Sequence, residues 1–363
     1  MNGPSDLIAT LETLVANSNI ARRADVLCEV TDLFVAGSSF FSKDQVDFFE
    51  DVMGRIIGQV TVAARSKIAA ELAGVANAPT GVLRTLALDE AIEVAGPMLE
   101  HSERLDDNIL LESGSANGQQ HLMAISKRNT LSSKVTDFLV ERGNSEVVLS
   151  TASNLGAEFS DVGYSALVSR SQDNLELAMR VWLRPEVPRR YLLQLLSEAS
   201  AAVSDSLEGL DRKRVKLLRN MTVRAADLLQ SETRQRSENF RIASARVEAL
   251  HANGAVDEEV LADFARKDEF DETIVALSLL SRLPIGVIER SLMDPLGQHL
   301  LIVCKAAGLK WETTESLFGL RGTISAQQLQ QMHCNFMKLQ TKTAKMAIEF
   351  YRLRENAASV AVS

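Results

Sequence analysis

The sequence predicts an all-α protein built as an α-solenoid, in which short helix pairs stack side by side, with a long central helix and a long C-terminal helix. Three observations support this prediction. The 363 residues include only seven prolines and 5% aromatic residues, whereas straight-chain residues, which lose little rotamer freedom in a helix, are abundant. Leucines recur every 28 residues in the first half of the chain. Near the C-terminus, apolar residues alternate by three and four, as in a helix that packs along one face.

Residues 1–204 are predicted to form a helical-repeat domain. The opening segment has no positive charge before its apolar residues, so it is interpreted as a helix capped by Ser5 and not as a signal peptide. Short polar side chains that cap helix N-termini repeat in step with the leucines. The two columns are Leu83, Leu111, Leu139, Leu167 and Leu195, and Asp89, Asn117, Ser145 and Asp173. Each unit is thus a leucine-bearing helix, a turn, a cap and a second helix, and neighbouring units must stack to bury their apolar faces.

Residues 205–252 are predicted to form one long central helix or two long halves, because they contain no glycine or proline after Gly209. An apolar stripe that includes Met221, Ala225 and Leu228 runs along the first part. The densest basic run of the chain is a candidate binding surface for an acidic partner, a phosphate-bearing ligand or anionic lipid headgroups. Its members are Arg212, Lys213, Arg214, Lys216, Arg219 and Arg224. A solvated cationic face is the plainer interpretation of the same residues.

Residues 253–363 are predicted to hold further repeats and the terminal helix. Shifting residues 264–284 by 28 positions lays them on residues 292–312 and pairs Ala276 with Cys304. This register favours a small buried side chain at Cys304 over a reactive thiol, which would need partial exposure and positive surroundings.

The stretch LIVCKAAGLKW (301–311) is therefore interpreted as the end of one helix and the start of another. Gly308 is placed where a left-handed helix terminus needs glycine, with Leu309 making the accompanying apolar contact. Thr313 or Thr314 is predicted to cap the next helix, and Ser325 the last one.

The last helix carries an unbroken alternation of apolar residues, as in the a and d positions of a coiled coil. Its candidate interface residues are Leu329, Met332, Phe336, Leu339, Met346, Phe350 and Leu353, with Thr343 in the same series. The flanking positions carry few complementary charges, which favours docking on the chain's own fold over a self-contained coiled coil. A homodimer through this helix is the alternative.

Little in the sequence points to chemistry. The net charge of −9 argues against broad nucleic-acid binding, since phosphates need a positive surface. The five histidines lie at no spacing that would place two metal ligands on one helix face, and the phosphate-loop, dinucleotide and nucleophile-elbow motifs are missing. No cofactor, no metal and no enzymatic activity are expected. Three scattered cysteines and the lack of a bilayer-length apolar stretch, which needs about 18 residues, predict a cytoplasmic protein.

Three segments resemble the alphaproteobacterial family called domain of unknown function 2336. They are VERGNSEVVLSTASNLG (140–156), LSLLSRLPIGVIERSL (277–292) and LIVCKAAGLKWETTESLF (301–318). The resemblance extends from about residue 10 to about residue 355. It implies HEAT-like helical repeats in a bacterial cytosolic protein, and it brings no catalytic residues with it.

Repeated helix pairs offer an extended surface to other macromolecules. The leading functional prediction is a non-enzymatic protein-interaction scaffold or adaptor, for example in bacterial signalling. The alternative is a sensor that binds a small anionic nucleotide or phosphate through Arg212, Arg214 and Arg219, in a pocket between the solenoid and the central helix. A nucleic-acid-acting helical-repeat enzyme is the second alternative.

Overall fold

The structure is a computed structural model that describes the chain except for residues 1–19, 207–211, 295, 322–323 and 361–363. The side chains of residues 20–21, 201–220, 223, 351 and 353–360 also lie outside the described part, as does the predicted helix at Ser5. Within the described residues the chain is all-α, with a single isolated bridge between Leu131 and Ala157. It divides into two compact units, an N-terminal unit (Met1–Arg184) and a C-terminal unit (Pro185–Ser363).

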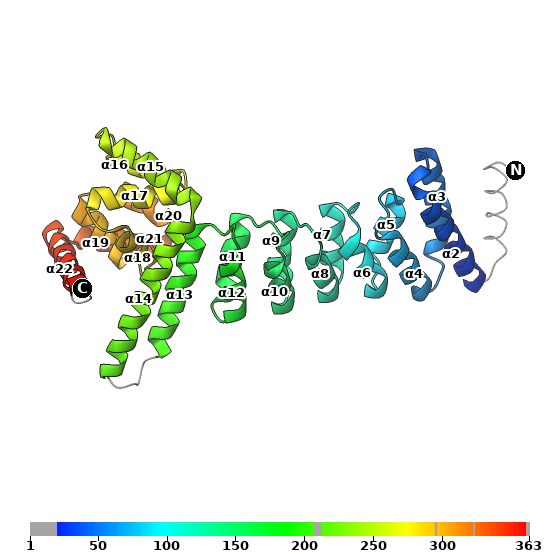
Figure 1. Cartoon of the computed structure of the whole chain (residues 1–363), viewed down its shortest axis with the longest axis horizontal. Helices are drawn as coiled ribbons and strands as arrows, with labels where there is room; N and C mark the ends of the chain where they lie inside the picture. Colours follow the sequence, from blue (N-terminus) through cyan, green and yellow to red (C-terminus); the bar gives the residue numbers. More distant parts are fainter. Residues whose placement is uncertain (1–19, 207–211, 295, 322–323, 361–363) are drawn as a thin grey trace. The chain divides into compact units, whose positions relative to one another are not determined.

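The N-terminal unit is a stack of short antiparallel helices in two layers (Figure 1). In one layer α4, α6, α8, α10 and α12 pack in succession, and in the other α3, α5, α7, α9 and α11 do so. The helices are α2 (Ile20–Gly37), η1 (Ser38–Phe40), α3 (Lys43–Ile57), α4 (Val62–Leu72), α5 (Thr80–Ala87), α6 (Ile92–His101), α7 (Asp107–Ala116), α8 (Gln119–Ser126), α9 (Ser133–Arg142), α10 (Ser145–Ser153), α11 (Asp161–Ser171) and α12 (Leu175–Leu183). This is the helical-repeat arrangement that the sequence predicts.

The leucine column lies on the first helix of each predicted pair. Leu83, Leu139 and Leu167 are buried in α5, α9 and α11, whereas Leu111 in α7 is half-buried. The fifth member, Leu195, is buried in the C-terminal unit. The column therefore marks the repeat within the N-terminal unit and then continues beyond it.

The predicted capping column is wrong by about one residue. Asn144 and Asn174, not Ser145 and Asp173, cap α10 and α12. Gly118 precedes α8 in place of Asn117. Ala91 directly precedes α6, and its N–H donates to Asp89 two residues earlier in the chain. The backbone is extended at Asn144 and Gly118, as is typical of a cap. Spacing alone does not tell which of two adjacent polar residues will adopt it.

Three polar side chains join successive repeats by bonding the carbonyl groups left free where the second helices end. Arg128, Asn154 and Arg184 bond carbonyl groups at or just beyond the C-terminal ends of α6, α8 and α10, respectively. The acceptors are Leu99 and Ser102 (both 2.7 Å), Ser126 and Arg128 (2.9 and 2.7 Å), and Ala152, Asn154 and Ala157 (3.0, 2.6 and 2.6 Å). Arg128 and Arg184 are buried, so these bonds form where water does not compete.

In the C-terminal unit, α13 and α14 form an antiparallel pair, and α15 and α18 pack against it (Figure 1). Its helices are α13 (Arg189–Ser206), α14 (Arg212–Arg236), α15 (Glu238–Ala252), α16 (Glu258–Arg266), α17 (Phe270–Ser281), α18 (Ile285–Met293), α19 (Gln298–Ala307), α20 (Trp311–Gly319), α21 (Ala326–Lys338) and α22 (Thr341–Val360). One core runs through Ile274, Leu292, Cys304 and Phe318. The predicted boundary between residues 204 and 205 lies inside α13.

The sequence allows either one long central helix or two long halves, and the structure has two helices, α14 and α15. Ser237 separates them and caps α15 by accepting the N–H of Phe240 at 3.1 Å. The predicted apolar stripe of α14 faces the core only in part, because Met221, Ala225 and Leu228 are exposed and Leu229 is half-buried. The side chains of its other members, Leu210, Leu217 and Leu218, lie outside the described part. Polar Gln230 is buried.

Around Cys304 the helix ends as predicted. Cys304 is fully buried, Gly308 has φ +80°, and the N–H of Leu309 bonds the Cys304 carbonyl at 3.0 Å. The predicted threonine cap is wrong, since α20 begins at Trp311 after Lys310. Thr314 lies within the helix and donates to the Lys310 carbonyl at 2.8 Å.

The predicted single C-terminal helix is also wrong. Ser325 begins α21 with a capping box, but the extended backbone of Leu339 ends that helix, and α22 starts at Thr341. The break changes which positions face the core. Phe336 of α21 is buried beside Trp311. Among the described side chains of α22, Ala344 and Ile348 are buried, and these are not members of the predicted series.

Candidate functional site

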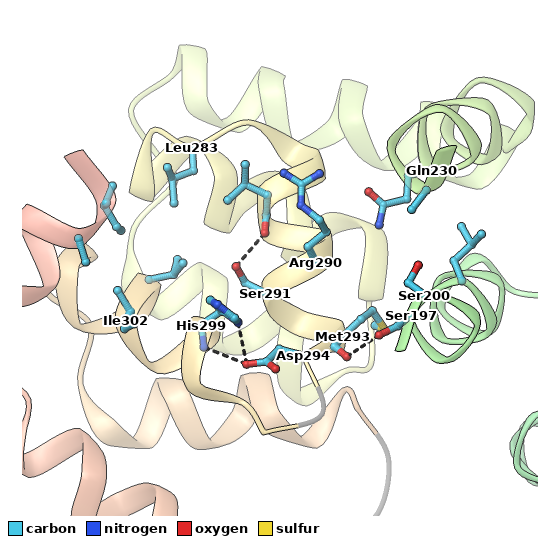
Figure 2. A pocket seen from close by; sticks show the side chains of 16 residues that line it. Ser197, Ser200, Gln230, Leu283, Arg290, Ser291, Met293, Asp294, His299 and Ile302 are labelled. Carbon is cyan, nitrogen blue, oxygen red and sulfur yellow. Dashed lines mark hydrogen bonds and ion pairs between the residues drawn. The ribbon is translucent and has the colours of Figure 1, made fainter. Parts of the chain in front are cut away.

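A cavity of about 370 Å³ lies inside the C-terminal unit, between α13, α14, α18, α19 and α22 (Figure 2). Its wall is largely apolar, which is typical of small-molecule sites of this size. The apolar lining residues are Leu196, Ala226, Leu283, Val287, Met293, Ile302, Val303, Ala347 and Ile348.

Helix α18 supplies one side of the cavity. Val287, Arg290, Ser291 and Asp294 are spaced by three, four and seven residues, so they lie on one face along the helix and just beyond its end. Pro284 precedes the first residue of α18, where a fixed φ favours helix initiation. The position of α18 therefore decides which polar groups reach the cavity.

The lower edge of the cavity in Figure 2 carries an Asp–His pair. The Asp294 carboxylate lies 2.9 Å from Nδ1 of His299 and accepts the backbone N–H groups of His299 (3.1 Å) and Leu296 (3.4 Å). Burial raises the pKa of Asp294, but the hydrogen bonds from the His299 side chain and backbone outweigh it and lower the pKa to about 2. The hydrogen bond to Asp294 raises the pKa of His299 against the opposing effect of burial. The pair thus fixes the turn that leads into α19.

Most other polar groups of the wall also have partners. Arg290 donates to Asp227 of α14, Ser197 donates to the Met293 carbonyl at 3.1 Å, and Ser291 donates to the Val287 carbonyl. Ser200 also has a partner. Gln230 differs, because its buried side-chain oxygen bonds nothing among the described residues.

A buried charge cluster holds the helices around the cavity together. Glu289 of α18 is paired with Arg189 of α13 through one oxygen and with Arg234 of α14 through the other, at 2.5 Å for Arg234. Arg189 also donates to Asp271 of α17 at 2.8 and 2.5 Å. Burial raises the pKa of Glu289 in spite of the two guanidinium groups.

The predicted basic residues fall on α14. Arg212, Lys213, Arg214, Lys216 and Arg219 lie in its first turns, and their side chains are outside the described part. Arg224 is exposed. Arg224 is not among the described residues that line the cavity.

The predicted interface residues do not share one surface. Phe336 is buried, and Leu329, Met332 and Leu339 are half-buried. Met346 and Phe350 are exposed on α22, and the side chain of Leu353 lies outside the described part. The predicted docking within the chain's own fold is seen for α21 and also for α22, which packs on α19 through Ala344 and Ile348, while an intermolecular role for Met346 and Phe350 stays a prediction.

Sequence reasoning missed the cavity. Its residues are scattered from Leu196 to Ile348 and come from five helices and the turns beside them. No spacing within one helix marks them as a group. Among the described residues no cluster of His, Cys, Asp and Glu could hold a metal ion, and no described helix is long and apolar enough to cross a membrane.

Comparison with known proteins adds a family. A family model described as "Uncharacterised protein conserved in bacteria (DUF2336)" matches residues 94–349, which is more than half of the chain. No match was found among curated proteins or among solved structures. The match confirms the family resemblance, while its restriction to alphaproteobacteria and the HEAT-like character of the repeats stay predictions. The chain therefore belongs to the bacterial DUF2336 family.

Proposed function

We propose that the protein is a non-enzymatic adaptor of the bacterial cytoplasm, and that it binds a partner protein through the outer face of α14. The observation that carries the proposal is a row of apolar side chains directed away from the core. Met221 is 58% exposed and Leu228 is 72% exposed, with exposed Ala225 between them. An apolar row of this kind on an otherwise polar helix is typical of an interaction surface.

A basic residue accompanies this row. Residues three and four apart are neighbours on the surface of an α-helix, and exposed Arg224 lies three residues from Met221 and four from Leu228. We call Met221, Arg224, Ala225 and Leu228 the α14 outer face.

The chemistry of the α14 outer face indicates the kind of partner. Helix α14 carries eight Lys or Arg residues and only two Asp or Glu residues, in a chain whose net charge is −9. An amphipathic helix would complement this surface, because its apolar stripe would pack on the apolar row and its flanking carboxylates would face the basic residues.

Site-specific photocrosslinking in the native bacterium tests the proposal. With benzoylphenylalanine in place of Leu228, we expect a discrete crosslinked partner whose crosslinked peptide is acidic and amphipathic. The same probe in place of Leu155, which is exposed in the N-terminal unit, should not capture it. The purified partner should bind the variants Met221→Ser/Leu228→Ser and Arg224→Glu at least tenfold more weakly.

Ile242→Ser is the matched control, because Ile242 is similarly exposed on the neighbouring helix α15. It should leave the affinity unchanged. Equal binding of the partner to the wild type and to both variants would contradict the proposal.

A second candidate function is supported by the cavity. A pocket with a largely apolar wall and a buried amide oxygen without a partner among the described residues is consistent with a small-ligand sensor. The side chains of Arg212, Arg214 and Arg219, the predicted contacts of such a sensor, lie outside the described part, so the ligand is argued from the described residues of the cavity.

A further inference from the structure

The charges around the cavity are balanced. Arg290 is paired with Asp227, His299 with Asp294, and Glu289 with two arginines, one of which also pairs with Asp271. An anionic ligand would therefore have to displace a carboxylate or lie without a counterion against a largely apolar wall, and both cost free energy. The wall favours a ligand without net charge.

Gln230 gives the cavity its unmet hydrogen-bonding capacity. The residue is 5% exposed, lines the cavity, and its side-chain oxygen is buried without a partner among the described residues. A carboxamide both accepts and donates hydrogen bonds. A buried polar group of this kind is stabilised when a ligand supplies its partner.

The α22 side of the cavity is apolar, with Ala347 and Ile348 in its lining, whereas the α13 and α14 side carries Gln230, Ser200 and Ser197 beside apolar Leu196 and Ala226. In Figure 2, Gln230, Ser200 and Ser197 lie on the side of α13 and α14, and Leu283 and Ile302 lie towards α22. At the packing density of protein interiors, a cavity of this volume holds roughly 15 non-hydrogen atoms. A ligand with a polar head and one aliphatic chain fits both the polarity and the size.

We propose that the cavity binds a small uncharged amphiphile whose primary amide or hydroxyl group bonds the Gln230 carboxamide, while its aliphatic chain lies against Leu283, Ile302 and Ile348. This inference rests on the second candidate function, the ligand sensor. It does not depend on the adaptor function, because the cavity and the α14 outer face are formed by different residues.

Displacement of the uncharged fluorescent probe N-phenylnaphthylamine from the purified full-length protein tests the proposal. Decanamide and decanol should displace the probe at concentrations at least tenfold lower than decanoate does at neutral pH. In Gln230→Leu the probe should still bind, while decanamide should lose about tenfold in affinity and its preference over decanoate should shrink.

Two alanines of α14 provide a matched pair of controls. Ala226 lines the cavity, and its neighbour Ala225 is exposed. Ala226→Leu should weaken probe binding at least fivefold, and Ala225→Leu should not change it. Circular dichroism of each variant checks that the helices are intact.

Decanoate binding as tightly as decanamide would overturn the inference in favour of an anionic ligand. Equal probe binding by Ala226→Leu and the wild type would show that the cavity is not the site. Either failure leaves the adaptor function standing, since the assay contains no partner protein.

Discussion

Arg189 and Glu289 form an ion pair between α13 and α18, although one hundred residues separate them in the sequence. Their side chains are 2% and 0% exposed. Arg234 holds the second carboxylate oxygen, so a single buried carboxylate connects three of the helices that line the cavity. Removing one member of such a cluster is costly, because its partners remain charged and buried.

We therefore expect Glu289→Gln to lower the free energy of unfolding by about 3 to 5 kcal/mol, as measured by urea denaturation. The control is Glu238→Gln, which removes an exposed ion pair with Arg241 on α15 and should cost well under about 1 kcal/mol. Similar losses in the two variants would show that the cluster does not hold the helices together.

Alkylation separates Cys304 from the other cysteines. Cys304 is fully buried, and burial raises the pKa of its thiol to about 12, so almost no thiolate forms at pH values where the protein is folded. Cys334 is exposed. We expect iodoacetamide to modify Cys334 in the native protein and Cys304 only after unfolding in urea, as measured by peptide mass spectrometry. Modification of Cys304 at a similar rate in the folded state would restore the reactive-thiol interpretation.

Local signals in the sequence were sufficient for the helices and several of their ends. Gly308 adopts the left-handed conformation predicted for it, and Ser325 caps α21. These features depend on residues within one turn of each other, so the sequence contains all the information needed.

Features that depend on tertiary packing could not be predicted in the same way. The stripe of Met221 and Leu228 has helical spacing, but its orientation depends on helices elsewhere in the chain. The cavity depends on five helices at once, and Gln230 could not be recognised as unpaired before its neighbours were known. Arg128 and Arg184 follow the ends of α8 and α12 and likewise bond carbonyls about 30 residues earlier, and no pattern in the adjoining helices marks that role.

Two phenylalanines test the corrected C-terminal helices. Phe336 is 3% exposed and lies near Lys305 and Trp311, whereas Phe350 is 70% exposed. We expect Phe336→Ala to cost about 3 to 5 kcal/mol in urea denaturation, as for other buried phenylalanines, and Phe350→Ala to cost less than about 0.5 kcal/mol.

Phe350 also tests the predicted homodimer. If α22 mediates self-association, sedimentation velocity should show a dimer in the wild type that is lost in Phe350→Ala. If Phe336→Ala and Phe350→Ala lowered the free energy of unfolding equally, one apolar seam would run through both helices, as the unbroken sequence pattern predicted.

The Asp294–His299 pair predicts a pH dependence of stability. The pKa of Asp294 is lowered from 3.8 to about 2, so its contribution is present above pH 3.8 and is lost as the pH falls towards 2. The pKa of His299 is raised from 6.5, so its contribution is complete below pH 6.5 and is lost as the pH rises through the raised value. The pair therefore stabilises the fold most between these limits.

His299→Gln should consequently lower the free energy of unfolding more at about pH 5.5 than at about pH 9. The effect at the lower pH should be about 0.5 to 1 kcal/mol at most, because the His299 side chain is 68% exposed and solvent screens the pair. His251→Gln is the control, since His251 is exposed, and it should lower the free energy of unfolding less than His299→Gln does at the lower pH. If His299→Gln lowered the free energy of unfolding as much at the higher pH as at the lower one, the imidazole would act through packing and not through its charge.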